Sequence, residues 1–229
     1  MTAPSKPLLP LLLSANAGYV DTVGFLALQG LFVAHVTGNF VTLGAALTHG
    51  SSGIIAKLLA LPVFCIAIVA LRLIVRKAQP KPEGALTKIL VAQVAFLTAG
   101  GGLAIYFGGF ANPDGLPLVM TGMLLVVAMA LQNAAHRLYL GSSPPSTLMT
   151  GTTTQVMIDL ADLIFGGPAN ERAIVRGRFG ALGVTVLCFA LGCGVGALSY
   201  ITLGMWCFAL PPVLALVCAG MVAATRATP

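Results

Sequence analysis

The chain has 229 residues, of which 58% are hydrophobic and 8% are charged, whereas soluble domains carry about 25% charged residues. This composition excludes an ordinary soluble enzyme or binding domain and indicates an integral membrane protein. The formal net charge of +6 is typical of basic cytoplasmic loops in such proteins, so we expect a lipid bilayer and no nucleic acid as partner. We expect one polytopic, all-α membrane domain over residues 1–229.

Six apolar runs have about the 20 residues that a membrane-spanning helix needs. They are Leu8–Leu28, Ile54–Val75, Leu86–Phe107, Leu116–Ala135, Phe179–Tyr200 and Leu203–Ala224. The first run is expected to be a retained span, because it carries Asn16 and Asp21 and no small-residue cleavage site. The five cysteines stand singly and suggest packing roles, so no disulfide, metal site or cofactor is predicted.

Two shorter runs, residues 31–48 and 146–165, contain more polar residues and carry "VTGN" and "MTGT" near their starts. Basic residues decide their topology, because they concentrate in cytoplasmic loops. The segments "RKAQPKPEGALTK" and "NERAIVRGR" both fall on the inner side only if the two short runs are re-entrant. We therefore predict six spans and two re-entrant or broken helices in an inner (plasma) membrane, with both termini cytoplasmic.

The two halves of the chain, residues 8–108 and 116–225, then have opposite orientations. Each half contains a span, a short polar run and two further spans. A weak sequence echo supports this arrangement: "VTGNFVTL" precedes "MTGTTTQV" by 113 residues, and Asp21 precedes Asn133 by 112. Paired inverted repeats of this kind are typical of secondary transporters.

Asp21 is the first candidate for chemistry. Ser14, Ala17, Gly18, Asp21 and Gly24 are spaced three and four apart, so they form one small, polar face that should point into the bundle. A carboxylate in a membrane span marks a functional site by default, although a packing role is the alternative. Screened from water it would hold a proton, whereas beside a cation such as Arg72 or His35 it would stay ionised.

The remaining candidates are polar residues at the two short runs and on the spans before them. Neutral amides and hydroxyls at such positions bind a ligand or tie helices together. The main ligand-binding candidates besides Asp21 are Thr37, Gly38, Asn39, Asn133, Thr150, Gly151 and Thr152, and the secondary ones are Asn16, Tyr19, His35, Gln132 and Gln155. For Asp159 and Asp162 we favour a solvated or arginine-paired structural role.

The segments "GYVDTVGFLALQGLFVAHVTGNFVTLG", "AMALQNAAHR" and "LMTGTTTQ" resemble an uncharacterised bacterial family of YoaK-type integral membrane proteins. The resemblance extends over most of the chain. It implies a multi-pass inner-membrane protein, and it implies neither a substrate nor a catalytic residue.

These features favour a secondary transporter or permease for a small polar or anionic solute. No nucleotide-binding loop is present, so pumping would use an ion gradient, with Asp21 as the candidate for proton coupling. A narrow channel is the close alternative. An intramembrane enzyme and a membrane scaffold or assembly protein without transport activity are the alternatives from other classes, and a homo-oligomer is left open.

Overall fold

The computed structural model describes residues 8–49, 52–79, 81–166 and 168–227, and every regular element in these ranges is helical. The elements in chain order are α1 (Leu8–Ala27), α2 (Gly38–His49), α3 (Ile54–Ala78), α4 (Pro82–Phe107), α5 (Leu116–Tyr139), α6 (Met149–Phe165), α7 (Ala169–Leu203), the 3₁₀ helix η1 (Gly204–Ala209) and α8 (Leu210–Ala227). The prediction of an all-α membrane protein is confirmed.

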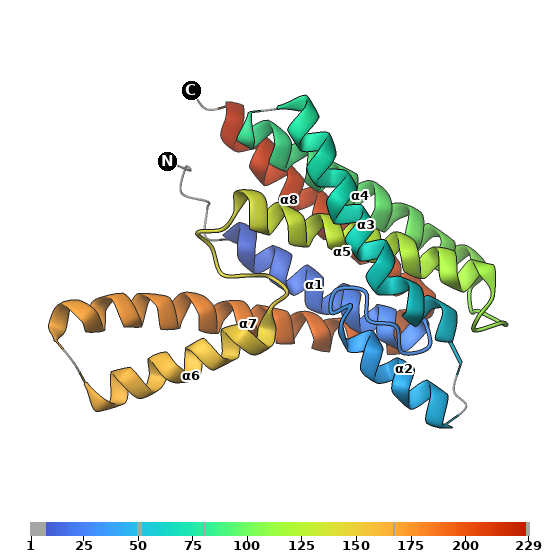
Figure 1. Cartoon of the computed structure of the whole chain (residues 1–229), viewed down its shortest axis with the longest axis horizontal. Helices are drawn as coiled ribbons and strands as arrows, with labels where there is room; N and C mark the ends of the chain where they lie inside the picture. Colours follow the sequence, from blue (N-terminus) through green and yellow to red (C-terminus); the bar gives the residue numbers. More distant parts are fainter. Residues whose placement is uncertain (1–7, 50–51, 80, 167, 228–229) are drawn as a thin grey trace.

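Six long helices, α1, α3, α4, α5, α7 and α8, correspond to the six predicted spans. Five stretches are long and apolar enough to cross a membrane, and the last of them, Ala169–Thr225, contains both α7 and α8. Residues 8 and 227 lie at the same end of the bundle, which we call the terminal end (Figure 1). The loops between α4 and α5 and between α7 and α8 lie at the opposite end.

Two boundaries of the predicted spans differ from the structure by seven residues or more. The basic segment "NERAIVRGR" is helical and belongs to α7, which begins ten residues before the predicted start of that span, because it packs along α6. The last span begins at Leu210 rather than Leu203, since Pro211 and Pro212 fit only the first turn of a helix. The preceding residues form η1 instead.

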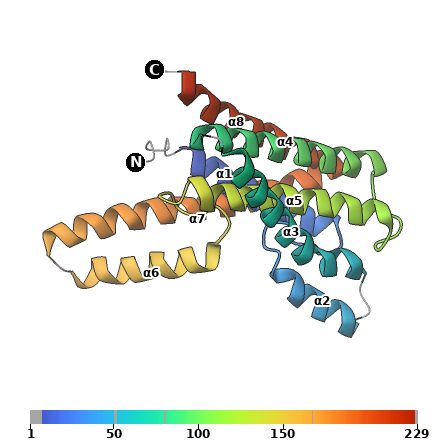
Figure 2. The same cartoon turned by 45° about the horizontal axis from the view of Figure 1, so that its top comes forward.

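Helix α6 and the first part of α7 lie side by side and project past the other helices at the terminal end (Figure 2). A bidentate ion pair joins them: Arg178 Nε and Nη2 donate to the fully buried Asp159 at 2.9 and 2.6 Å. The Arg178 guanidinium holds the pKa of Asp159 below its usual value. The expected arginine-paired role of Asp159 is therefore confirmed.

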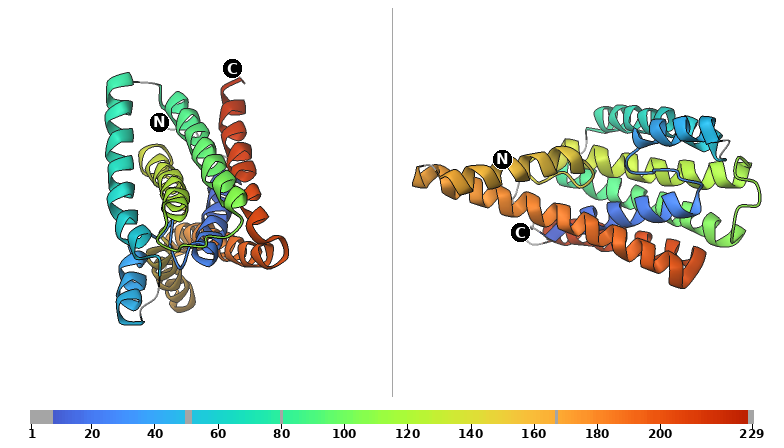
Figure 3. Two further views of the ribbon diagram at one scale, coloured as in Figure 1. Left: turned by 90° about the vertical axis from the view of Figure 1, so that its right-hand side faces the viewer. Right: turned by 90° about the horizontal axis from the view of Figure 1, so that it is seen from below.

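Each of the two short helices follows an irregular segment that is bonded to a long helix. Helix α2 begins beside the middle of α1 and runs toward the end opposite the terminal end, whereas α6 begins beside α5 and runs toward the terminal end (Figure 3). In each case the chain first crosses as a long helix, then turns back as an irregular segment, and then forms the short helix. We call residues 28–37 the first break and residues 140–148 the second break.

Helix α1 lies at the centre, and its small-residue face points inward as predicted, with Ser14 and Ala17 fully buried. Glycines bring α7 against it: a Cβ at Gly18 would collide with the Phe189 carbonyl, and one at Gly192 would collide with the Ala15 carbonyl. Gly24 serves a different contact, because a Cβ there would lie 3.2 Å from the Val33 side chain in the first break.

Candidate functional site

The first break begins where α1 ends. Gln29 and Gly30 both have left-handed backbone conformations, with φ of 58° and 79°, and the Gly30 N–H donates to the Phe25 carbonyl at 2.9 Å. This is the glycine-terminated helix end that reverses the chain direction. The chain then returns along α1 into the interior of the bundle.

Asp21 holds this returning segment in place. One carboxylate oxygen, Oδ1, accepts hydrogen bonds from the backbone N–H groups of Val33 and Ala34 at 2.8 and 2.7 Å, with His35 N–H at 3.5 Å. These N–H groups have no partner from a regular helix, and the buried carboxylate satisfies them. Asp21 is therefore the anchor of the break, and its Oδ1 has no capacity left for a solute.

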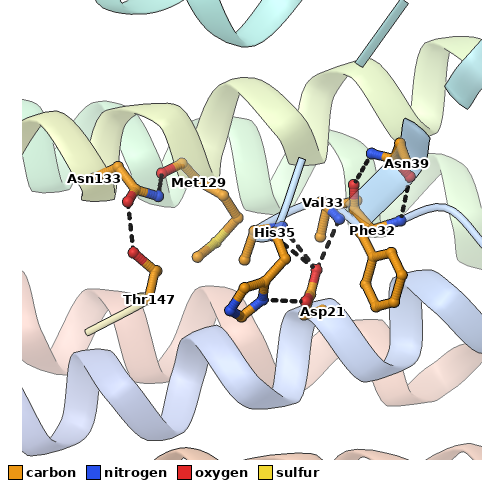
Figure 4. A network of polar contacts seen from close by, with 9 residues as sticks. Asp21, Phe32, Val33, His35, Asn39, Met129, Asn133 and Thr147 are labelled. Atoms are coloured by element: carbon orange, nitrogen blue, oxygen red, sulfur yellow. Dashed lines mark hydrogen bonds and ion pairs between the residues drawn. The ribbon is translucent and has the colours of Figure 1, made fainter. Parts of the chain in front are cut away.

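The other carboxylate oxygen of Asp21 bonds the imidazole of His35. The distance from Oδ2 to Nδ1 is 2.7 Å, and the exposed fractions are 6% for the aspartate side chain and 33% for the histidine. The imidazole also packs edge-on against Phe189 of α7, with ring centroids 5.3 Å apart. The second ring nitrogen points to the side on which Thr147 lies, and the Thr147 backbone interacts with the ring (Figure 4).

Asn39 fixes the other end of the first break. Its side-chain amide donates to the Phe32 carbonyl at 2.7 Å, and its carbonyl oxygen accepts from the Phe32 N–H at 2.9 Å (Figure 4). Both the nitrogen and the oxygen of the amide are thus bonded to the backbone of Phe32. The N–H groups of Gly38 and Asn39 donate to carbonyls three residues earlier, so the start of α2 is a tightly bonded turn.

The second break repeats this design with neutral groups. Pro144 and Pro145 prevent α5 from continuing, and the Thr147 hydroxyl donates to Asn133 Oδ1. Asp21 and His35 are fourteen residues apart, and so are Asn133 and Thr147. Each anchoring residue, 21 or 133, also lies six residues before the end of its helix. Both pairs appear in Figure 4.

A cavity of about 430 Å³ lies between the two breaks and the helices α3 and α5. Its lining residues from the first break are Ala34, His35, Val36 and Thr37; from α3, Phe64, Ile68 and Arg72; from α5, Asn133, Ala134, Arg137 and Leu138; and from the second break, Thr147 and Leu148. The volume is within the range of small-molecule sites, about 300–1,000 Å³.

Three of the predicted site residues, Thr37, His35 and Asn133, line this cavity. Asp21 lies directly behind His35. Thr150 and Gly151 lie on an exposed part of α6 outside the cavity lining, and the hydroxyl of the buried Thr152 donates to the Leu148 carbonyl at 2.7 Å. The lining of the second break therefore comes from the residues before α6.

The secondary candidates other than His35 lie away from the cavity. Tyr19 donates its hydroxyl to the Cys207 carbonyl at 2.8 Å, which joins α1 to η1. Gln132 donates to the Leu13 carbonyl and accepts from Gln93 at 2.7 Å. Asn16 is fully buried, and its side-chain atoms have no hydrogen-bond partner.

Gln155, the last of the secondary candidates, lies on α6, where its side chain donates a hydrogen bond to Asp159, the partner of Arg178.

Sequence patterns did not predict that Arg137 lines the cavity or that Phe189 packs against His35. One signal for the site was available. The 112-residue offset that relates Asp21 to Asn133 also relates His35 to Thr147, so the offset marks both partners of each pair.

Comparison with known proteins agrees with the resemblance described above. The family "Protein of unknown function (DUF1275)" matches residues 9–221. The chain is 29% identical over 156 residues to the UPF0700 transmembrane protein YoaK of Bacillus subtilis (strain 168), a match that covers 67% of each chain. No solved structure matches. Because the family model covers most of the chain, this membrane protein belongs to the DUF1275 family.

Proposed function

We propose that this protein is a secondary transporter or permease for a small polar or anionic solute. The cavity carries the proposal: it lies between two chain breaks and the membrane-spanning helices α3 and α5, and it is lined by polar groups from both breaks. Broken helices in a membrane bundle are tolerated where they line a binding site or a cavity. Substrate sites beside discontinuous helices are a common feature of secondary transporters.

The matching anchors of the two breaks support an inverted-repeat arrangement. Residues 21 and 133 each hold a residue fourteen positions later, and the two short helices run toward opposite ends. We propose that residues 8–108 and 116–225 are two inverted halves. Rocking of one half against the other would then open the cavity to alternate sides of the membrane.

We further propose that the Asp21–His35 pair couples transport to protons. Asp21 Oδ1 is held by backbone N–H groups, so the exchangeable proton of the pair belongs between Oδ2 and the imidazole. With a proton bound, the pair is an ion pair of zero net charge. Without it, the pair carries one negative charge beside the cavity. Loss of the proton would therefore change both the local charge and the contact that holds the first break.

The test is solute uptake by purified protein in liposomes, with and without a proton gradient. A panel of small organic acids, inorganic phosphate and neutral amino acids covers the proposed classes. We expect saturable uptake of at least one solute, and we expect Asp21→Asn to abolish its proton dependence. Asp162→Asn is the matched control, because it makes the same chemical change at an exposed position of α6.

The outcomes separate the alternatives. Flux that never saturates would indicate a channel. Absence of flux for the whole panel, in protein that is folded and correctly inserted, would overturn the transport proposal. Uptake and proton dependence that are unchanged in Asp21→Asn would remove Asp21 from the mechanism while leaving transport intact.

A further inference from the structure

The lining of the cavity is positively charged. Arg72 enters from α3, Arg137 from α5, and His35 from the first break, whereas no aspartate or glutamate is among the lining residues. Asp21 is the carboxylate behind His35, and its oxygens accept from that imidazole and from the backbone. The cavity therefore presents two arginines, whereas the adjacent His35–Asp21 pair adds no net positive charge.

Neither arginine has a partner within the described part of the chain. The ion pairs found there join Asp21 to His35 and Asp159 to Arg178, and both Arg72 and Arg137 are exposed at the edge of the cavity. Arg72 lies six residues before the end of α3, which is about 9 Å along the helix axis. A cation at such depth in a span is costly unless an anion or water accompanies it.

A third feature adds positive potential to the same space. Helix α2 begins at Gly38, directly after the lining residues Val36 and Thr37. The N-terminus of a helix carries about half a positive charge. The two arginines and the start of α2 therefore both add positive potential near the cavity.

We propose that the cavity is an anion-binding site, in which Arg72 of α3 and Arg137 of α5 bind the carboxylate or phosphate group of a small solute. Guanidinium groups match these anions because their planar donors form paired, charge-assisted hydrogen bonds. This inference rests on the proposed function and names the substrate class of that site. The phosphate of a lipid headgroup has the same chemistry, and the experiment below separates the two sources.

The test measures binding rather than transport. Purified protein is titrated with inorganic phosphate and with succinate, and succinamide, the uncharged diamide of succinate, is the matched ligand control. Calorimetry gives the affinity, and thermal stability reports folding. We expect saturable binding of at least one anion and no binding of the diamide. Arg72→Gln and Arg137→Gln should each weaken binding about 10-fold or more, because each loses a charge-assisted contact.

Arg76→Gln is the matched protein control, because Arg76 lies one turn further along α3 and is not among the lining residues. It should bind the anion as the wild type does. A second series in nanodiscs compares phosphatidylcholine alone with added phosphatidylglycerol. If the arginine variants change retention of the anionic lipid but no free anion binds, the site belongs to a headgroup and the inference is wrong.

The two proposals fail differently. Anion binding without flux in liposomes would refute transport and leave the anion site. Flux of a neutral solute by protein that binds neither anion would refute the anion site and leave transport. Equal anion affinity in wild type and both arginine variants would also overturn the assignment of Arg72 and Arg137.

Discussion

The contact between α1 and α7 gives a stability prediction with an internal control. Gly192 and Gly194 lie two residues apart on α7, but a Cβ at Gly192 would lie 3.0 Å from the Cα of Ala15 and closer still to its carbonyl oxygen, whereas a Cβ at Gly194 would meet nothing within 4 Å. Carbon atoms in good contact are about 3.5–4.0 Å apart. Gly192→Ala therefore forces the helices apart, and Gly194→Ala does not.

The magnitude follows from the difference between the two variants. Replacing glycine by alanine in a helix favours the helix by up to about 1 kcal/mol, and this gain is common to both sites. Overpacking a close contact costs about 1–3 kcal/mol, and this cost applies only at Gly192. We expect Gly192→Ala to be less stable than Gly194→Ala by about 1–3 kcal/mol, with Gly194→Ala at or above the wild type.

Reversible unfolding in mixed micelles, followed by circular dichroism, measures this difference. A gap smaller than about 0.5 kcal/mol, which is the usual scatter of harmless substitutions, would refute the helix contact as described. The variant also has a consequence for the site, because α7 carries Phe189, whose ring packs against His35. Gly192→Ala should therefore perturb the His35 ring resonances in an NMR spectrum, while Gly194→Ala leaves them in place.

Three further predictions concern other elements. Asn39→Ala should lower the melting temperature, because the part-buried N–H and carbonyl groups of Phe32 lose their side-chain partner; an unchanged value would contradict the anchoring role. Asp159→Asn should speed amide exchange in the α6–α7 hairpin at neutral pH. Arg178 lowers the pKa of Asp159 from its ordinary value of 3.8, so the difference between variant and wild type should shrink below pH 3.8 and disappear below the lowered pKa. For topology, single cysteines at positions 84 and 112 should be labelled from the cytoplasmic and outer sides respectively, and the reverse pattern would refute the proposed orientation.

Much of the fold follows from simple patterns along the chain. Run length and hydrophobicity are enough to find the long helices, and the small-residue face of α1 points inward because lipid favours large apolar side chains. The short run of residues 31–48 does contain a short helix, α2, which begins at Gly38 within the segment "VTGN". The break before it follows from Gly30, whose positive φ ends α1.

The site was less predictable, because its contacts join separate segments of the chain, and the sequence alone does not show which segments lie close together in space. Asp21 could be identified as an inward carboxylate, but its bonds to the backbone of Val33 and Ala34 involve groups common to all residues. Arg137 stands at a helix end, where basic residues are common for reasons of topology alone. Its place at the cavity depends on how α5 packs against α3.

The two breaks share the fourteen-residue spacing of their anchoring pairs and differ in the charge of those pairs. Asn133 and Thr147 form a neutral bond, which does not titrate near neutral pH. Asp21 and His35 form an ionisable pair, so the anchor of the first break can respond to protons. Under the proposed function, proton binding by this pair would change the charge beside the cavity and the contact that holds the first break. The arginines that line the cavity would then link the bound proton to the charge of the proposed solute.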